Sequence, residues 1–187
     1  MKALQIVSYG EFKDSLAFNE VSKPTAQVKD VLIEVKAAAI NPIDKLIILG
    51  NLQGMLPIPL PSSIAYDVSG IVVEKGDEVT NFEIGDLVYS RVPQEQMGTI
   101  AEYVAVTSVA VSKKPINISF EEAASLPLAG LTAMQSLEYA GIKANDKVLI
   151  HAGSGGVGSL AIQYAKAKGA YVYTTTSTNN VKWVKEL

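Results

Sequence analysis

The sequence contains no cysteine, and this absence removes several kinds of chemistry. Without thiols there are no disulfides, no thiolate nucleophile and no cysteine-bound metal. Histidine is almost absent as well, because His151 is the only one. It falls in a predicted strand, and we expect it to be packed in the core rather than to bind a metal.

An excess of positive charge is also missing. Lysine and arginine total 16 against 19 acidic residues, for a net charge of −3. No basic field is available to hold nucleic acid or an anionic membrane. The longest uncharged run, Leu46 to Tyr66, contains three prolines and two glycines, which a membrane helix would not tolerate. The apolar stretch from Ala3 to Val7 is too short for a signal-peptide core, so we expect a cytoplasmic protein.

The 187 residues change character near residue 120. Before that point, short β-rich runs alternate with turn residues, which predicts a compact barrel or sandwich. In the run 31–37, Val31, Ile33, Val35 and Ala37 are expected on one face. Strands are also expected at 68–74 and 87–90, with Gly85 in the turn between them and Val79 and Phe82 pointing inward. The runs 100–106 and 109–112 are predicted to pair through a tight connection.

After residue 120, helices alternate with strands. Ser119 with the two glutamates that follow predicts a helix start, and 131–140 predicts a second helix ending at Gly141. A buried strand is expected at 147–152 and another strand at 171–176. The helix between them, 157–168, is expected to bury one face made of Val157, Leu160, Ala161, Tyr164 and Ala165. This is the order of a parallel α/β sheet.

The strongest motif lies between the first of these strands and the helix. It reads Gly153-Ser154-Gly155-Gly156-Val157-Gly158, a G-x-G-x-x-G. In this context Gly153 permits the turn, Gly155 lets the backbone approach a pyrophosphate, and Gly158 lets the helix approach the strand. The helix N-terminus, with Gly156 and Val157, offers free N–H groups to the phosphates. The motif predicts dinucleotide binding.

The choice of dinucleotide depends on the end of the next strand. NAD-preferring sites place an acid there, about 20 residues beyond the motif, to bind the ribose hydroxyls. This chain has Thr174 to Asn180 without an acid, and the first cation beyond is Lys182. Ser177 and Lys182 are the candidate contacts for a 2′-phosphate, which favours NADPH. The alternative is that these residues form only a solvated loop.

Five segments, in this order, resemble one family along essentially the whole chain. They are AAAINPID, YDVSGIVVEKGDEVTNFEIGDLV, GTIAEYVAV, EEAASLPLAGLTAMQSL and VLIHAGSGGVGSLAIQYAKAKGA. The chain resembles the zinc-free quinone oxidoreductases of the medium-chain dehydrogenase/reductase (zinc-type alcohol dehydrogenase-like) superfamily. The resemblance implies a GroES-like catalytic domain at 1–120 and the first part of an NADP-binding Rossmann domain at 121–187. The fold class is therefore α/β, with a β-rich domain followed by the start of a doubly wound parallel sheet.

The resemblance also identifies what this chain lacks. In the zinc alcohol dehydrogenases of the superfamily, Cys occupies the position of Asn41 and His the position of Tyr66. The four-cysteine structural zinc lobe is absent too, so we expect no bound metal. Ala65 stands where the family usually has Gly. If that position requires a positive φ, alanine there costs about 1 kcal/mol or shifts the loop.

By the same resemblance, Asn41 and Thr132 are expected to flank the nicotinamide, and Tyr66 to line the pocket. Simpler interpretations remain open: Tyr66 packs in the core, and Asn41 before a proline is only a turn residue. No Ser-Tyr-Lys or paired-carboxylate arrangement identifies a proton donor. The catalytic residues are therefore unassigned, with Asn41 and Tyr66 as pocket candidates.

The leading hypothesis is an enzyme that transfers hydride from NADPH to a small-molecule quinone or to an α,β-unsaturated carbonyl (an enone or enal), without zinc. The alternative is a non-catalytic NADPH-binding sensor or scaffold, and a lone GroES-like interaction module is disfavoured by the glycine-rich loop. We expect a homo-oligomer, a dimer, at full length. The sequence holds one βαβ unit of a fold that needs two halves, so we also expect it to be a fragment.

Overall fold

The computed structural model describes residues 1–187 and divides them into two compact units, Met1–Pro127 and Leu128–Leu187. The division falls later than the expected boundary at residue 120. Helix α3 (Phe120–Ala124) packs against strands β3 and β5, so it belongs to the first unit. A capping box between Ser119 and Glu122 begins α3, as the sequence predicts.

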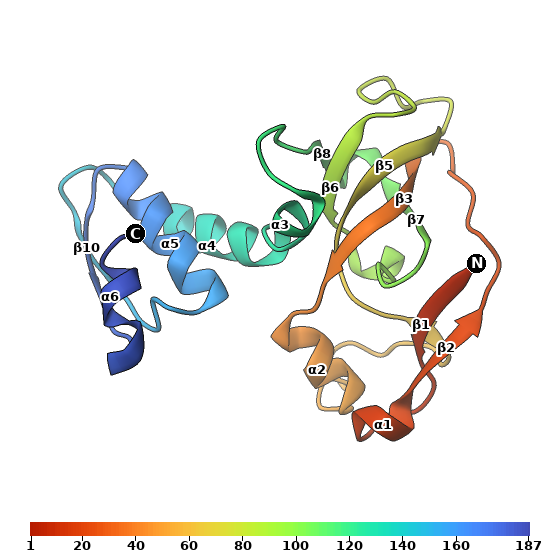
Figure 1. Cartoon of the computed structure of the whole chain (residues 1–187), viewed down its shortest axis with the longest axis horizontal. Helices are drawn as coiled ribbons and strands as arrows, with labels where there is room; N and C mark the ends of the chain where they lie inside the picture. The colour runs from red at the N-terminus through yellow and green to blue at the C-terminus, as the bar shows by residue number, and fades with distance from the viewer. The chain divides into compact units, whose positions relative to one another are not determined.

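A five-stranded antiparallel sheet is the main element of the first unit, in the order β7-β3-β5-β6-β8 (Figure 1). Its strands are β3 (Asp30–Ala39), β5 (Asp67–Lys75), β6 (Leu87–Arg91), β7 (Tyr103–Thr107) and β8 (Val111–Lys113). The turn between β5 and β6 buries Val79 and Phe82 and has Gly85 at φ 95°. The predicted strands and this turn are confirmed.

The predicted pairing of the runs 100–106 and 109–112 is wrong. Strand β7 pairs with β3 and β8 pairs with β6, so the two lie at opposite edges of the sheet. In a flat sheet these edges would be about 19 Å apart, four inter-strand spacings. The chain from Thr107 to Val111, through the 3-10 turn η2 (Ser108–Ala110), reaches at most about 14 Å. The sheet must therefore roll toward a barrel.

Strand β3 does not show the simple alternation of burial that its sequence predicts. Leu32, expected on the outer face, is fully buried together with Val31 and Ile33. The pairing of β3 with β5 shifts register between Leu32 and Ile33, and again between Val35 and Ala37. The extra residue is Val73 on β5 in the first shift and Lys36 on β3 in the second, so β3 keeps its period of two as far as Val35. Leu32 therefore faces away from Val31 and Ile33, and β3 is buried on both faces at these residues.

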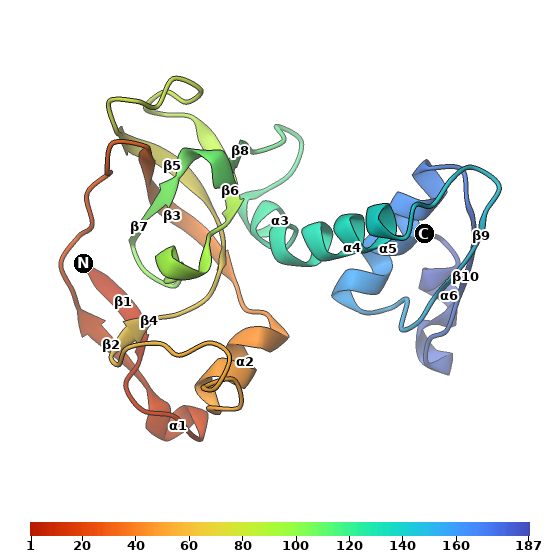
Figure 2. The ribbon, with the colours of Figure 1, turned by 180° about the vertical axis from the view of Figure 1, so that it is seen from behind.

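A smaller sheet with the order β2-β1-β4 completes the first unit (Figure 2). It contains β1 (Lys2–Ile6), β2 (Leu16–Glu20) and the two residues of β4 (Ser62–Ser63), with α1 (Phe12–Ser15) between the first two. The helix α2 (Pro42–Ile48) follows β3, and η1 (Gln94–Gln96) follows β6. A separate apolar cluster joins this sheet to α2 through Ile6, Ile48 and Ile64.

The second unit has one parallel strand pair. Its elements are α4 (Pro127–Tyr139), β9 (Lys147–Ile150), α5 (Gly156–Ala167), β10 (Tyr171–Thr174), η3 (Thr178–Asn180) and α6 (Val181–Val184). Strands β9 and β10 pair in parallel, as the alternating pattern predicts. Helices α4 and α5 end before Gly141 and Gly169, which have φ 67° and 83°. None of the helices combines the length and the apolar character needed to cross a bilayer.

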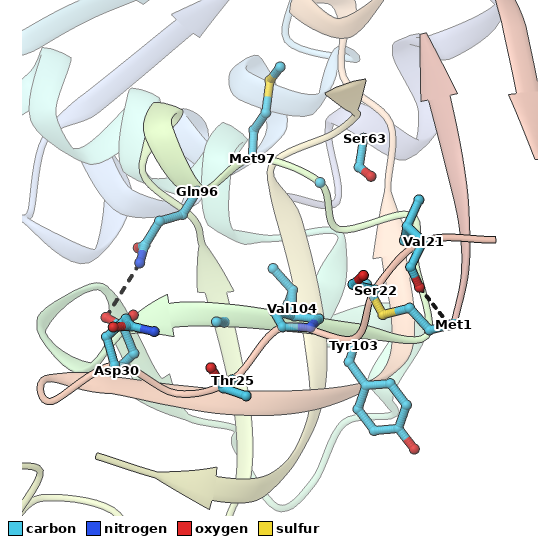
Figure 3. Close-up of a pocket in the computed structure, with 14 residues that line it drawn as sticks. Met1, Val21, Ser22, Thr25, Asp30, Ser63, Gln96, Met97, Tyr103 and Val104 are labelled. Atoms are coloured by element: carbon cyan, nitrogen blue, oxygen red, sulfur yellow. Dashed lines mark hydrogen bonds between the residues drawn. The ribbon is translucent and has the colours of Figure 1, made fainter. Parts of the chain in front are cut away.

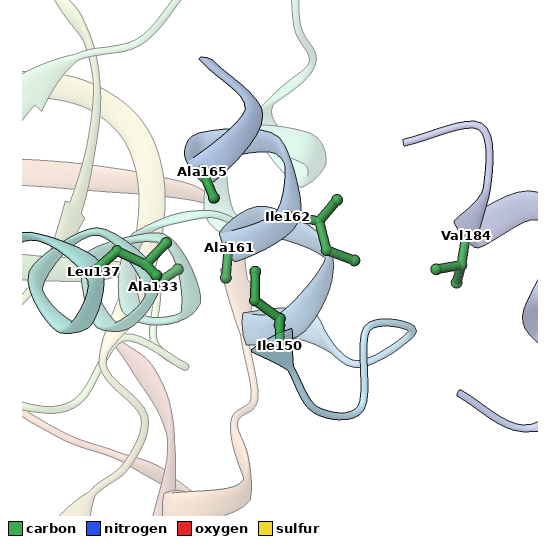
Figure 4. Packing of buried hydrophobic residues seen from close by; sticks show 7 residues of the cluster. All are labelled: Ala133, Leu137, Ile150, Ala161, Ile162, Ala165 and Val184. Carbon is green, nitrogen blue, oxygen red and sulfur yellow. The ribbon is translucent and has the colours of Figure 1, made fainter. Parts of the chain in front are cut away.

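The core of the second unit lies between α4, α5, α6 and one face of the strands. Figure 4 shows its buried side chains: Ala133, Leu137, Ile150, Ala161, Ile162, Ala165 and Val184. The predicted face of α5 is partly wrong, because Val157 is 40% exposed whereas Ile162 is buried. Ile162 instead packs in the cluster around Ile150.

The other face of the strand pair is open, and the expectation of a buried strand at 147–152 is wrong. Leu149 is 59% exposed, and Tyr171 and Tyr173 on β10 are exposed to a similar extent. Parallel strands are usually covered on both faces, but the core described above covers only one here. The strand also ends at Ile150, two residues earlier than predicted.

Candidate dinucleotide-binding site

The glycine-rich loop connects the end of β9 to the start of α5. Gly155 is the N-cap of α5, and its N–H donates to the carbonyl of Ala152 at 2.9 Å. The left-handed residue of the turn is Ala152, with φ 54°, and not Gly153. The expectation that Gly153 supplies the turn through its own freedom is therefore corrected.

Two glycines of the motif are required by close approaches. A Cβ on Gly158 would lie 2.3 Å from the carbonyl oxygen of Ala152, so any side chain would push α5 away from the end of β9. A Cβ on Gly153 would lie 2.2 Å from the Thr174 hydroxyl oxygen. Both distances are shorter than Cβ atoms accept, so the loop, helix and neighbouring strand fit only with glycine at these positions.

The first turn of α5 leaves backbone donors without helical acceptors. Gly156, Val157 and Gly158 are its first three residues, whose N–H groups lie ahead of the helical hydrogen-bond ladder. These groups and the positive end of the helix dipole suit an anion. The residues present therefore fit a dinucleotide pyrophosphate at this loop.

The rim beyond β10 carries hydroxyls and no acid. The Thr174 hydroxyl donates to the Ile150 carbonyl at 2.6 Å, which joins the ends of the two strands. Ser177 is the N-cap of η3, and its hydroxyl accepts from the Asn180 amide at 3.0 Å. Lys182 lies on α6 with its side chain exposed. A 2′-phosphate would meet no carboxylate between Thr174 and Lys182.

His151 is exposed, so its predicted place in the core is wrong. It lies just beyond the end of β9, and its Nδ1 is 3.1 Å from the hydroxyl of Thr175. The strand ends before the chain reaches this residue, which places the ring at the carboxyl edge of the sheet. The contact between His151 and Thr175 depends on the register of β9 with β10, so no local sequence pattern predicts it.

In the first unit, Asn41 is held by two buried carboxylates. It is the N-cap of α2, and its backbone N–H donates to Asp44 Oδ2 at 2.6 Å. Its side-chain amide donates to Asp67 Oδ2 at 2.9 Å. Asp44 is 2% exposed and Asp67 1% exposed. Neither acid was singled out from the sequence, although Asp44 three residues after an N-cap is a capping signal.

Tyr66, which directly precedes Asp67 in the chain, is fully buried. Its hydroxyl has no hydrogen-bond partner, and the Arg91 guanidinium lies 4.9 Å from its ring centre. Burial raises the pKa of Tyr66, the charge of Asp44 raises this pKa further, and Arg91 lowers it. Burial also raises the pKa of Asp44, against the opposing hydrogen bond from Asn41. Within its unit, Tyr66 is packed in the interior.

Ala65 has φ 75°, so the position does require the left-handed conformation. The Ala65 carbonyl accepts the N–H of Gly98 at 2.9 Å and that of Thr99 at 3.3 Å. These bonds fix the loop in which Ala65 and Tyr66 lie. The departure from the usual glycine at this position therefore carries a conformational cost.

Thr132 lies on α4 in the second unit, whereas Asn41 and Tyr66 lie in the first. Its side chain is exposed, and its hydroxyl donates to the Leu128 carbonyl at 2.7 Å, one turn earlier. Within each unit, the structure brings together the glycine-rich loop with Thr174 and Thr175, and Asn41 with its two carboxylates.

A separate cavity of about 380 Å³ lies in the first unit, against β7 and the segment that precedes β3. Figure 3 shows Gln96 reaching across it to Asp30, with an amide-to-carboxylate distance of 3.4 Å. The cavity includes neither Asn41 nor Tyr66. No group of three or more His, Cys, Asp or Glu side chains is arranged to hold a metal ion.

A rolled β sheet followed by a parallel β-α-β unit with a glycine-rich loop is the architecture of a nucleotide-dependent dehydrogenase or reductase. Comparison with known proteins agrees. Residues 27–116 match the alcohol dehydrogenase GroES-like domain. The whole chain is 40% identical to a 2-methylene-furan-3-one reductase from Solanum lycopersicum, of which it covers 50%.

Two solved structures are similar over the full chain. The quinone oxidoreductase from Coxiella burnetii matches with 41% identity and a TM-score of 0.88, over 59% of its chain. The Escherichia coli quinone oxidoreductase complexed with NADPH matches with 28% identity and a TM-score of 0.86, over 56% of its chain. The chain belongs to the medium-chain dehydrogenase/reductase superfamily, in its quinone oxidoreductase branch. It spans about half the length of the curated relatives it matches.

Proposed function

We propose that the protein is an NADPH-dependent oxidoreductase that reduces a small quinone or α,β-unsaturated carbonyl without zinc. The observation that carries the proposal is the glycine-rich loop. Gly158 lies against the Ala152 carbonyl, and three free backbone donors begin α5. Such a loop has one well-understood use, to hold a dinucleotide pyrophosphate at a helix N-terminus.

The choice of NADPH follows from the rim. The segment from Thr174 to Lys182 has hydroxyls, amides and one lysine, and no acid to bind a free ribose 2′-hydroxyl. Ser177 and Lys182 are the proposed contacts to the 2′-phosphate. A similar quinone oxidoreductase, that of Escherichia coli, was solved with NADPH bound, which supports the assignment.

The acceptor class is supported by the names of the relatives. One is a quinone oxidoreductase, and another reduces a 2-methylene-furan-3-one, which is an α,β-unsaturated ketone. Bound NADPH supplies the hydride in both kinds of reaction. Asn41, Tyr66 and Thr132 are the proposed pocket residues of this chain.

Zinc independence is proposed from the donor set. Asn41 and Tyr66 stand where the zinc enzymes have Cys and His, and the chain has no cysteine. Three ligands of Cys, His or carboxylate type are needed for a catalytic zinc. Asp44 and Asp67 are near Asn41 but already accept its hydrogen bonds.

Calorimetric titration of the full-length protein with NADPH and NADH tests the cofactor, and its NADPH oxidation against a quinone panel and an enone panel tests the reaction. We expect tighter binding of NADPH, turnover on at least one panel, and no stoichiometric zinc by elemental analysis after dialysis. Replacing Lys182 with alanine should weaken the binding of NADPH and leave the binding of NADH nearly unchanged. NADH binding as tight as NADPH binding would contradict the cofactor assignment. NADPH binding without turnover would favour a non-catalytic sensor or scaffold.

A further inference from the structure

A small hydrogen-bond network joins the two strand ends beside the glycine-rich loop. The Thr175 hydroxyl oxygen accepts the Ala152 N–H at 3.2 Å and lies 3.1 Å from His151 Nδ1. The Gly153 N–H donates to the Thr175 carbonyl at 2.9 Å. The side chain of His151 is thus tied to the loop's own scaffold, although it is exposed.

The network is compatible with a proton on Nε2 of His151. A threonine hydroxyl has one hydrogen to donate, and a neutral imidazole has one N–H. The Thr175 oxygen already accepts from Ala152, and its hydrogen has only His151 Nδ1 as an acceptor among its partners. When this hydrogen is donated to Nδ1, the neutral ring carries its proton on Nε2. The exposed side of the ring then presents an N–H donor.

The position of that donor matches one part of a dinucleotide. In NAD-preferring sites, the acid at the end of the second strand accepts hydrogen bonds from the adenosine ribose. In this chain that strand end holds Thr174, Thr175 and Thr176, and His151 is bonded to the middle one. The hydroxyl oxygen of Thr176 is buried and has no partner, so the same edge keeps an unused polar group.

We propose that His151 is a specificity-determining residue, whose Nε2–H donates to the 2′-phosphate of NADPH while Thr175 holds the ring in place. The proposal rests on the proposed function, because it requires NADPH at this loop. A neutral N–H donor facing a phosphate gives a charge-assisted hydrogen bond, which NADH cannot form because it has a hydroxyl at that position.

Two substitutions separate the two nitrogens of the ring. Asparagine places its amide near the position of Nδ1, so His151→Asn keeps a partner for Thr175 but removes the outward donor. Glutamine reaches the position of Nε2, so His151→Gln keeps an outward donor. We expect His151→Asn to weaken NADPH binding about tenfold or more, and His151→Gln to stay within about threefold of the original protein. NADH binding should change little in either variant.

Nitrogen-detected NMR of the imidazole provides a readout without cofactor. We expect the Nε2–H tautomer in the original protein and a mixture of tautomers in Thr175→Val, which removes the hydroxyl and keeps the shape. Thr175→Val should also weaken the binding of NADPH more than the binding of NADH. An Nδ1–H tautomer in the original protein would overturn the proposal, since Nε2 would then repel a phosphate.

The binding data distinguish this proposal from the proposed function. If the original protein binds NADPH tightly and both His151 variants bind it equally well, the role of His151 is wrong and the cofactor assignment stands. If His151→Asn weakens the binding of NADPH and of NADH equally, the residue stabilises the loop and does not contact the 2′-phosphate. If the original protein does not bind NADPH at all, both proposals are wrong.

Discussion

The two units of this chain differ in how their sheets are closed. In the first unit the five-stranded sheet rolls on itself, and Leu32, Val68, Val88 and Val106 are completely buried. In the second unit the two strands β9 and β10 are covered on one face, while Leu149 on the other is 59% exposed. A rolled sheet makes its own interior, whereas a parallel pair depends on other elements to cover it.

The polar groups follow the same division. The first unit buries Asp44 and Asp67 around Asn41, and burial raises the pKa of Asp44. The second unit keeps His151 and Thr175 exposed at the ends of its strands, and Lys182 exposed on α6. Groups held in the interior serve mainly to fix local structure, whereas exposed groups on a firm strand edge remain available to a ligand.

The largest expected effect tests the difference in closure with one matched pair. Leu32→Ala should lower the free energy of unfolding of the first unit by about 2–5 kcal/mol, because it leaves a cavity in a closed interior. Leu149→Ala should change stability by less than about 0.5 kcal/mol, because its side chain is mostly exposed. Denaturant unfolding of both variants measures the contrast. Equal losses would show that the open face is covered in solution.

The next largest effect concerns the close approach of α5 to β9 in the second unit. Gly158→Ala should destabilise that unit by about 1–3 kcal/mol, because the new methyl group would meet the Ala152 carbonyl. Gly156→Ala is the control, since its methyl would lie 3.8 Å from the Ala129 side chain, an ordinary contact. Thermal unfolding followed by circular dichroism should separate the two variants. If both unfold at the same temperature, the close approach at Gly158 is not real.

A smaller effect of opposite sign is expected in the first unit. Ala65→Gly should stabilise it by about 0.5–1 kcal/mol, because glycine removes the strain of φ 75° but adds freedom to the unfolded chain. Ala105→Gly, at a strand position in β7, should instead destabilise by about 0.5–1 kcal/mol. Chemical denaturation measures both changes. A loss of stability in Ala65→Gly would show that the left-handed conformation of Ala65 is not strained.

The smallest effect concerns the pH dependence of the buried acid. A raised pKa means that Asp44 favours folding when it is protonated, and that this contribution is lost as pH rises from the ordinary value of 3.8 through the raised one. Asp44→Asn stays neutral and can still accept the Asn41 N–H. We expect equal stability of variant and original protein at low pH, and a more stable variant at neutral pH.

Asp86 provides the opposite case. The N–H of Glu83 and then Lys113 lower the pKa of this half-buried carboxyl, so its contribution is present above its ordinary pKa and is lost as pH falls. Asp86→Asn should therefore be less stable than the original protein at neutral pH, and the difference should vanish at low pH. If urea titrations at several pH values give both asparagine variants the same slope against pH, the assignment for Asp44 is wrong.

Local patterns predicted the elements well. The capping box at Ser119, the turn at Gly85 and the close approach of Gly158 are each written in a few adjacent residues. Pairing was harder to predict, because nothing local shows that β7 joins β3 while β8 joins β6. The predicted burial of β9 was wrong for a related reason. An apolar run shows what a strand could bury, but not whether another element covers it.

The candidate site shows the same contrast between local features, which the sequence predicts, and long-range contacts, which it does not. The glycine-rich loop follows from spacing and context, but the contacts between distant residues do not. Asn41 meets Asp67 only because β5 lies beside the end of β3, and His151 meets Thr175 only because β9 and β10 are in register. These pairs are 26 and 24 residues apart in sequence, so no local pattern contains them.

The rolled sheet also has a consequence for the order of folding. The pairing of this sheet with the largest separation in sequence joins β3 to β7, with Asp30 opposite Thr107, so a loop of 77 residues must be closed before that ladder can form. In the second unit, Lys147 opposite Tyr171 closes a loop of only 24 residues. Non-local pairing slows folding because loop entropy is lost before the contacts compensate for it. We therefore expect the strand pair of the second unit, although less well covered, to form before the rolled sheet of the first unit.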